Sequence, residues 1–420
     1  IISALETTVD PNGDGNLADH HDVVNMSLGG LAVAEDPLVA AVDAVVNAGV
    51  VVVVSAGNSG PGGDRDCRKG SGFDGFDSVC SPAVSRNVIS VGATYKREYQ
   101  GKYWLDQDPP VDLVTSFSSR GPVFNVEGLI HRSLLKPDIV APGAIICSSR
   151  YDSIYPVGTS PYYFPCNGDE QHVQIAGTSM SAPVVAGAAA LLLEAHPEWV
   201  PQQVKYALRN SAEDVAQHPY LQGYGRMNVQ AALAQPAVLI AQLEEATVAD
   251  QTLRMIGTLD GAGLARYDLS YTVSASYVDA GSAEFTSFFS QPISAPANHA
   301  VLFDGAFDWL RLGNAELLFK LRVVGGNGSQ STEVMPVRVT NYELLEPQNN
   351  DVRRLGDRID LKGRVAAGYD YRFDYGVGEH PTDWRTDGIT LTREGLKLAT
   401  WDTAKLGASG MYTVRLGASY

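Results

Sequence analysis

The sequence predicts an α/β fold with a parallel β-sheet flanked by helices, followed by all-β sandwich-like modules. Up to about residue 235, short β-branched runs alternate with segments of helical spacing. After Pro236 the pattern changes to a period of two residues, with Gly, Asn and Asp turns and almost no helical stretch. These observations divide the chain into three expected parts: residues 1–236, 237–343 and 344–420.

The first part begins with a β–α–β unit. Residues 23–26 and 50–54 are short β-branched runs, and residues 36–48 between them carry apolar side chains at helical spacing. Because parallel strands need a crossover between them, this order favours a parallel sheet covered by helices. Further strands are expected at residues 88–91, 139–140 and 145–146.

The β-rich second half holds a weak internal repeat. Residues 256–271 resemble residues 361–375, and residues 317–323 resemble residues 411–416. The spacing fits two sandwich-like modules. The second module stops abruptly after Tyr420, so we expect its natural end to lie further on.

Composition indicates a globular, acidic protein. The 420 residues are 45% hydrophobic and 19% charged, which suits two or three packed domains. Lys and Arg number 31 against 48 Asp and Glu, a net charge of −17, so nonspecific binding to nucleic acid or anionic lipid is disfavoured. The longest apolar run, residues 182–193, is shorter than a membrane span of about 18 residues and is typical of a buried core helix.

Four cysteines fall as two local pairs, Cys67 with Cys80 and Cys147 with Cys166. Neither spacing is that of a zinc site, and no histidine lies beside them at ligand spacing. We favour two disulfides over free buried thiols, and disulfides would indicate an oxidising compartment.

The segment from Gly177 to Pro183 carries the strongest chemical signal. Small residues surround Ser179, and an apolar helix follows, with Pro183 in its first turn. A serine at a helix N-terminus is suited to nucleophilic chemistry, because the helix dipole and free N–H groups stabilise an oxyanion. The alternative is that Ser and Thr here merely cap a core helix.

The heptad at residues 177–183, Gly-Thr-Ser-Met-Ser-Ala-Pro, resembles the nucleophile motif of the subtilisin-like serine proteases (subtilases). Other segments resemble motifs of that family in the right order, over about residues 1 to 235. They are residues 25–30 (Asn-Met-Ser-Leu-Gly-Gly), 55–60 (Ser-Ala-Gly-Asn-Ser-Gly), 117–122 (Phe-Ser-Ser-Arg-Gly-Pro), 136–143 (Lys-Pro-Asp-Ile-Val-Ala-Pro-Gly) and 224–228 (Tyr-Gly-Arg-Met-Asn).

The resemblance implies a secreted or cell-surface serine endopeptidase that cuts protein or peptide substrates. Ser179 would be the nucleophile, and Asn58 would donate its amide to the tetrahedral intermediate. The main chain of Ser27, Leu28, Gly29 and Gly30, here called the substrate segment, would pair with an extended peptide. Ala56, Gly57 and Thr178 would also line the substrate site. We call residues 55–60 the oxyanion loop.

The sequence departs from the family at the catalytic Asp and His, which precede the serine in the family's chain order. No His-Gly-Thr-His motif occurs, and the adjacent Asp19, His20, His21 and Asp22 stand in a loop just before the substrate segment. The chain also opens at Ile1 without Met or a signal-peptide pattern. We therefore expect an upstream segment that carries Asp and His, without which this chain would be inactive.

An acidic loop precedes the first strand. Asp10, Asn12, Asp14 and Asn16 match the opening of a calcium loop, in which carboxylates at alternate positions face one cation. The twelfth position is His21 instead of Glu, so Asp19 or Asp22 would close the shell. The first 64 residues contain no Lys or Arg to neutralise these acids, which favours calcium over a solvated acidic turn.

Several alternatives stay open. Residues 62–80 resemble an inserted loop, whose acids either shape a specificity pocket or second cation site or decorate a disulfide-bonded surface loop. The chain could be a catalytically degenerate subtilase that acts as a binding or scaffold protein. The β-modules could instead carry adhesion, with aromatics forming a carbohydrate platform or packing in a core: Tyr369, Tyr371, Phe373, Tyr375 and Trp384.

Overall fold

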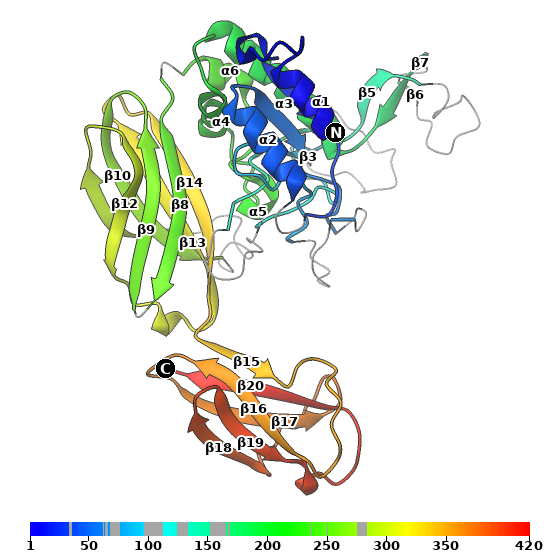
Figure 1. Cartoon of the computed structure of the whole chain (residues 1–420), viewed down its shortest axis with the longest axis vertical. Coiled ribbons are helices and arrows are strands. Elements are labelled where there is room, and N and C mark those ends of the chain that lie inside the picture. The colour runs from blue at the N-terminus through cyan, green and yellow to red at the C-terminus, as the bar shows by residue number, and fades with distance from the viewer. Residues whose placement is uncertain are drawn as a thin grey trace. The chain divides into compact units, whose positions relative to one another are not determined.

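The computed structural model describes most of the chain (Figure 1): residues 1–32, 36–61, 63, 66–67, 76–95, 112–123, 133–151, 165–166, 169–235, 237–249, 251–274 and 284–420. The chain forms two compact units. The first unit contains residues 1–247, 254–303 and 318–337, and the second contains residues 248–253, 304–317 and 338–420.

A four-stranded parallel sheet forms the centre of the first unit. Its order is β1 (Val23–Met26), β2 (Val51–Ser55), β3 (Ile89–Thr94) and β4 (Ile139–Pro142). Val51 and Val53 pack in the core on one face, whereas Val52 and Val54 pack in the core on the other. Burial on both faces explains why this strand is an unbroken apolar run, and it confirms the predicted α/β class.

Helices cover both faces of the sheet. On one face lies α2 (Pro37–Asn47), which starts where the Asp36 carboxylate accepts from the N–H of Leu38. The short helix α1 (Ile2–Val9) packs beside α2 and buries Leu5 in the same core. On the other face lies α3 (Thr178–Ala195), whose buried side chains pack against alternate residues of β2, β3 and β4.

Helix α3 is the one helix in the described part of the chain that is long and apolar enough to cross a membrane. Here it packs against the sheet, and seven of its side chains are buried. Its outer face is an exposed, mostly apolar stripe of Pro183, Val184, Gly187, Ala190 and Leu191. Among the described strands, β1 stands at the edge of the sheet.

The remaining helices of the first unit are short. They are α4 (Pro201–Asn210), α5 (Pro219–Gln222) and α6 (Val229–Leu233), with a 3-10 turn at Leu17–Asp19. Val204, Ala207 and Leu208 of α4 complete the core beneath α3.

One predicted strand does not join the parallel sheet. Strand β5 (Ile146–Ser149) pairs antiparallel with β7 (Asp169–Ile175), which also pairs with β6 (Pro165–Cys166). Ile145 adopts a φ of 59°, so the chain turns sharply between β4 and β5 and leaves the sheet. The expectation that this strand extends the parallel sheet is therefore wrong.

Both predicted disulfides are formed. Cys147 on β5 is bonded to Cys166 on β6, and Cys67 is bonded to Cys80. Neither pair leaves a free thiol, because the four cysteines are all bonded.

The rest of the chain is antiparallel β-structure, as predicted. The first group of strands is β8 (Ile240–Ala249), β9 (Thr252–Asp260), β10 (Leu264–Val273), β11 (Thr286–Pro292), β12 (Ala297–Ala306), β13 (Ala315–Gly325) and β14 (Gln330–Val339). The second group is β15 (Tyr342–Glu346), β16 (Arg358–Val365), β17 (Asp370–Val377), β18 (Ile389–Glu394), β19 (Lys397–Asp402) and β20 (Tyr412–Ser419). Short 3-10 turns occur at Leu310–Leu312 and Thr403–Lys405.

The strand order of the two groups agrees with the internal repeat. The sheets are β12-β9-β8 with β11-β10-β13-β14, and β15-β16-β19-β18 with β17-β20. The repeated segments are successive strands, β9 and β10 in one group and β16 and β17 in the other. In each group the strand that closes the repeat, β13 or β20, lies beside the second of them.

Most of the aromatic side chains considered for a carbohydrate platform lie inside the second unit. Phe373 and Tyr375 belong to the same buried cluster as Trp401, whose ring Tyr375 contacts, and Tyr371 packs against this cluster. Tyr369 is also buried, while the Trp384 ring stacks under the guanidinium of Arg415 at 3.8 Å. The packing alternative is therefore confirmed for Phe373 and Tyr375.

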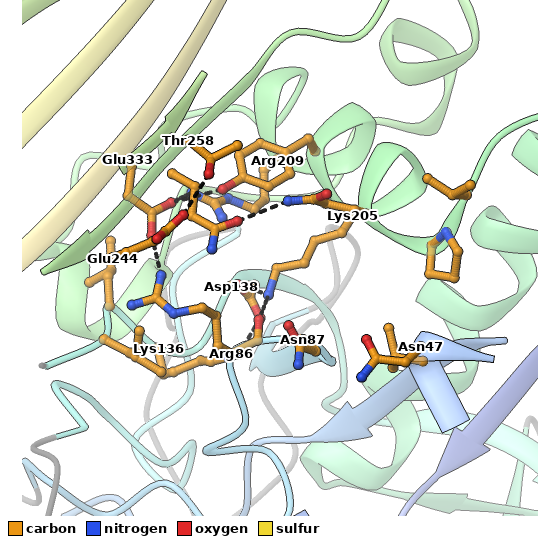
Figure 2. A pocket seen from close by; sticks show the side chains of 18 of the residues that line it. Asn47, Arg86, Asn87, Lys136, Asp138, Lys205, Arg209, Glu244, Thr258 and Glu333 are labelled. Carbon is orange, nitrogen blue, oxygen red and sulfur yellow. Dashed lines mark hydrogen bonds and ion pairs between the residues drawn. The ribbon is translucent and has the colours of Figure 1, made fainter. Parts of the chain in front are cut away.

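Buried charges join β4, α4 and β14 within the first unit (Figure 2). The Asp138 carboxylate contacts Lys136 at 2.7 Å and Lys205 at 2.8 Å. Burial alone would raise the pKa of Asp138, but Lys136, Lys205 and Arg209 together hold this pKa well below its usual range. The group therefore stays ionised, and its contribution to stability is present above the ordinary carboxyl pKa and declines under strong acid.

Glu333 on β14 is the second acidic centre of this network. It forms an ion pair with Arg209, and the hydroxyls of Tyr206 and Tyr224 donate to it at 3.3 Å. The Arg209 guanidinium lies 3.7 Å from the Tyr224 ring centroid and is almost completely buried. The buried charges of Arg209 on helix α4 and Glu333 on strand β14 thus neutralise each other.

Glu333→Gln should destabilise the first unit by about 3–5 kcal/mol, because it leaves the Arg209 guanidinium buried without its counter-ion. Urea unfolding followed by fluorescence measures this change in the free energy of unfolding. Glu198→Gln is the matched control, since Glu198 is 69% exposed in its ion pair with His196 and should cost less than about 1 kcal/mol. Equal, small effects of the two substitutions would contradict the structural role of Glu333.

Candidate functional site

Ser179 is the second residue of α3 and stands at the end of the sheet where β1 and β2 finish. The N-cap residue of the helix is Gly177, which has no side chain, so neither Thr178 nor Ser179 is the capping residue that the alternative required. The neighbouring hydroxyls of Thr178 and Ser181 are completely buried, and Ser181 Oγ donates to the carbonyl of Ala141 at 3.0 Å. Ser179 is the partly exposed hydroxyl of the three.

The substrate segment lies directly beside Ser179. Ser179 Oγ is 3.4 Å from the carbonyl oxygen of Ser27, and Ser27 Oγ donates to the carbonyl of Ser179 at 2.7 Å. Asn25 Nδ2 in turn donates to Ser27 Oγ at 3.1 Å. The end of β1 and the start of α3 are therefore joined at the predicted nucleophile, although 152 residues separate them in the sequence.

Thr178 fixes the orientation of the Asn58 amide. Asn58 Oδ1 accepts from the backbone N–H of Thr178 at 3.0 Å and from Thr178 Oγ1 at 3.1 Å. The same hydroxyl oxygen accepts from the N–H of Gly57 at 3.1 Å. With its oxygen held in this way, the amide turns Nδ2, a donor, away from Thr178. Nδ2 lies near the start of α3, since a β-carbon on Gly177 would be 3.5 Å from it.

Two glycines in the predicted site have no room for a side chain. Gly57 has a φ of 106°, and a β-carbon on it would lie 2.3 Å from Cys80 Sγ and 2.8 Å from Ser119 Oγ. A β-carbon on Gly29 would lie 2.8 Å from Cys80 Cβ, whereas one on Gly30 would meet no atom within 4 Å. The open space of the substrate segment is therefore at Gly30, and the Leu28 side chain of the same segment is exposed.

Some main-chain groups of the predicted site are already paired within the protein. The N–H of Ala56 donates to Val91 and its carbonyl accepts from Cys80, each at 2.9 Å. Gly30 exchanges two hydrogen bonds with Ser81, at 2.9 and 3.1 Å. In this structure Ala56 and Gly30 brace the site.

Sequence reasoning missed the part played by residues 80–81: it treated Cys80 as the end of an inserted loop and did not consider Ser81. These residues lie between the substrate segment and the oxyanion loop and pair with both. The pairing of Cys67 with Cys80 was the one available signal, because Cys67 lies only a few residues after Asn58.

The histidines before β1 do not approach Ser179. His20 Nδ1 lies 2.9 Å from the carbonyl of His21, and His21 Nδ1 lies 3.4 Å from the carbonyl of Thr8. Both stand before the first residue of β1, whereas Ser27 follows its last. A strand rises about 3.3 Å per residue, so the length of β1 separates them from the nucleophile. His131 lies outside the described residues.

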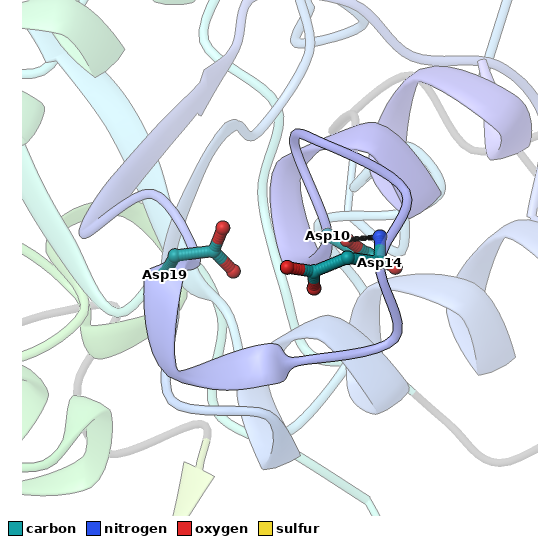
Figure 3. A group of neighbouring side chains, drawn as sticks. All are labelled: Asp10, Asp14 and Asp19. Carbon is teal, nitrogen blue, oxygen red and sulfur yellow. Dashed lines mark hydrogen bonds between the residues drawn. The ribbon is translucent and has the colours of Figure 1, made fainter.

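The predicted calcium loop gathers three carboxylates (Figure 3). One oxygen from each of Asp10, Asp14 and Asp19 lies within 4.8 Å of the others. The Asn12 amide donates to Asp14 at 3.1 Å and to Asp19 at 2.8 Å. Asn16 Oδ1 accepts from the N–H of Ala18 and starts the 3-10 turn that carries Asp19. Asp22 is not in this group, so the arrangement favours Asp19 as the closing residue.

A partly exposed serine at a helix N-terminus, with an asparagine amide bonded to the residue before it, is an arrangement typical of serine hydrolases. A model of the subtilase family matches residues 2–225, more than half of the chain. The chain belongs to the subtilase family.

Two curated relatives agree with this assignment. Serine protease AprX of Bacillus subtilis is 36% identical over 241 residues, covering 55% of this chain and 46% of AprX. Subtilisin of Bacillus pumilus is 32% identical over 216 residues, covering 51% of this chain and 58% of that protein. A solved protease of Pseudoalteromonas arctica aligns with a TM-score of 0.37 and 21% identity over 56% of this chain and 57% of that one. The chain spans about half the length of the curated relatives it matches.

Gly57→Ala should destabilise the protein by about 1–3 kcal/mol, because the positive φ is strained and the β-carbon would collide with Cys80 Sγ. Gly30→Ala is the control, since its β-carbon meets open space and should shift stability by less than about 0.5 kcal/mol. Thermal unfolding of both variants measures the difference. A Gly57→Ala protein as stable as the wild type would mean that the oxyanion loop is not packed against Cys80.

Proposed function

We propose that this protein is a secreted or cell-surface serine endopeptidase that forms an acyl-enzyme on Ser179. The observation that carries the proposal is the Asn58 amide, whose oxygen is held by Thr178, the residue directly before Ser179, so that Nδ2 is left on the other side of the amide. This arrangement supports attack by Ser179 Oγ on a peptide carbonyl. The developing oxyanion would accept from Asn58 Nδ2 and from the N–H of Ser179 at the start of α3.

The reaction follows from that geometry. An extended peptide would lie along the substrate segment, with its scissile carbonyl above Ser179. The serine proton would pass to a histidine and then to the leaving amine, an aspartate would orient that histidine, and water would release the acyl group by the reverse route.

We place the catalytic Asp and His on a segment upstream of Ile1. Two features of the described fold support this placement. Strand β1 has an open edge among the described strands, and Val184 and Leu191 on the outer face of α3 are 39% and 48% exposed. A further strand beside β1 and a helix over α3 would cover both, and burial of such side chains typically contributes about 1.5–3 kcal/mol each.

We also propose that the acidic loop binds calcium. Asp10, Asp14 and Asp19 offer hard oxygen ligands, with Asn12 between them, and these residues fit such an ion. The ion would join the end of α1 to the turn before β1, and so brace the entry to the substrate segment. Two disulfides support an oxidising, extracellular location.

The catalytic roles predict a graded response to substitution in the full-length protein. Ser179→Ala should abolish fluorophosphonate labelling and peptide hydrolysis, because the probe reacts with the nucleophile. Asn58→Ala should keep the nucleophile but lower kcat by about 10²- to 10³-fold. Ser181→Ala is the matched control and should still be labelled, since its hydroxyl is buried against Ala141.

Mass spectrometry of the labelled peptide and of the N-terminus identifies the nucleophile and the natural start of the chain. A folded full-length protein that resists the probe would contradict the proposal. It would favour the alternative of a catalytically degenerate subtilase that binds or scaffolds.

The calcium proposal predicts a melting temperature that depends on the ion. At a free calcium concentration of about 100 times Kd, the wild type should gain about 2.7 kcal/mol relative to a chelator. Asp19→Asn should lose this gain, whereas Asp22→Asn, whose carboxylate is outside the acidic group, should retain it. No calcium-dependent shift in the wild type would overturn the proposal, and loss only in Asp22→Asn would reassign the closing ligand.

A further inference from the structure

Cys80 lies between the two segments that the proposed protease site requires. Its Sγ occupies the space next to Gly57 of the oxyanion loop, where a β-carbon would come within 2.3 Å. On its other side, a β-carbon on Gly29 of the substrate segment would come within 2.8 Å of Cys80 Cβ. Cys80 is only 5% exposed, so these contacts are packed and dry.

Hydrogen bonds attach the same short stretch to both segments. The N–H of Cys80 donates to the carbonyl of Ala56 at 2.9 Å. The next residue, Ser81, donates to Gly30 at 2.9 Å and accepts from it at 3.1 Å. Residues 80–81 therefore set the spacing between the oxyanion loop and the substrate segment.

The other half-cystine is attached to the far side of Asn58. Cys67 is 2% exposed, and its N–H donates to Ser59 Oγ at 3.0 Å. The N–H of Ser59 donates to Ser119 Oγ at 2.9 Å, and the N–H of Ser119 donates to the carbonyl of Gly57 at 2.9 Å. The residues before and after Asn58 are thus both held from the protein side.

The disulfide closes these contacts into a ring. Starting at Asn58, the ring runs through Ser59 to Cys67, across the disulfide to Cys80, and back through Ala56 to Gly57. A cross-link between the two attachments limits how far the loop can move relative to residues 80–81. Asn58 is a member of this ring, and Thr178 holds its amide oxygen.

We propose that the Cys67–Cys80 disulfide is a positioning element of the protease site, which holds the Asn58 donor at a fixed place relative to the substrate segment. The inference rests on the proposed function. Oxyanion donors act strongly because they are already in place when charge develops, so a loop free to move loses part of their effect. Misplacement by about 1 Å can cost up to about 10²-fold in rate.

The test is a double-mutant cycle in the full-length active protein. The paired substitution Cys67→Ser with Cys80→Ser should lower kcat/KM by about 10- to 100-fold. In this background Asn58→Ala should also have a smaller effect: the fold decrease in kcat/KM that it causes, here called the Asn58→Ala penalty, should be at least about fivefold smaller than in the wild type. The reason is that a misplaced donor already contributes less to the rate, so its removal changes the rate less. If the disulfide only stabilises the fold, its removal lowers the amount of folded enzyme equally with and without the Asn58 side chain. The Asn58→Ala penalty would then be unchanged.

The second disulfide supplies the matched control. Cys147→Ser with Cys166→Ser also removes one cross-link, but the link joins β5 to β6 and touches neither Gly29 nor Gly57. The penalty of Asn58→Ala should be the same in this variant as in the wild type. Titrating active sites with a fluorophosphonate probe corrects each kcat for the folded fraction.

The outcomes separate this inference from the proposed function. A wild-type protein without peptide hydrolysis would refute the protease, whatever the disulfide does. Hydrolysis by the wild type together with an unchanged Asn58→Ala penalty after removal of Cys67–Cys80 would overturn the positioning role. If the paired variant does not fold, Ser59→Ala replaces it in the cycle, because it keeps the disulfide and removes only the hydroxyl that holds the Cys67 N–H.

Discussion

The packing of α3 across the parallel sheet is the constraint on which the rest of the structure depends. Ala182, Val185, Ala189 and Leu192 are completely buried against alternate residues of the strands, so the helix cannot rotate or slide without opening the core. Because the strands are parallel, β1 and β2 both end at the same edge of the sheet. The N-terminus of α3 reaches that edge, and this brings Ser27, Asn58 and Ser179 together.

The three hydroxyl groups at the start of α3 make different contacts. Ser181 bonds to the sheet, Thr178 holds the Asn58 amide, and Ser179 remains partly exposed. Gly177 begins the helix and has no side chain to cap it, and in the first turn the N–H of Thr178 donates to the Asn58 amide oxygen.

Most of the first group of strands, β8 to β14, belongs to the same compact unit as the parallel sheet, and buried charges contribute to this contact together with an apolar cluster that includes Leu318 and Val334. Arg209 on α4 is buried, and Glu333 on β14 supplies its counter-ion. Lys205, one turn earlier on the helix, pairs with Asp138 at the start of β4. Removing one partner of such a pair would leave a buried charge without its counter-ion, which typically costs about 3–5 kcal/mol.

Local patterns in the sequence were enough to predict the α/β class, β1 to β4, α2, both disulfides and the family motifs around Ser179. Each of these is encoded within a short stretch: an apolar run for a strand buried on both faces, helical spacing for α2, and seven consecutive residues for the nucleophile motif.

Only the tertiary structure decided how those pieces meet. The turn at Ile145 removes β5 from the sheet, Asp19 instead of Asp22 joins Asp10 and Asp14, and Cys80 lies between Gly29 and Gly57. Glu333 meets Arg209 across 124 residues of chain. Such contacts depend on backbone conformation and on packing between distant segments, which no spacing within one segment records.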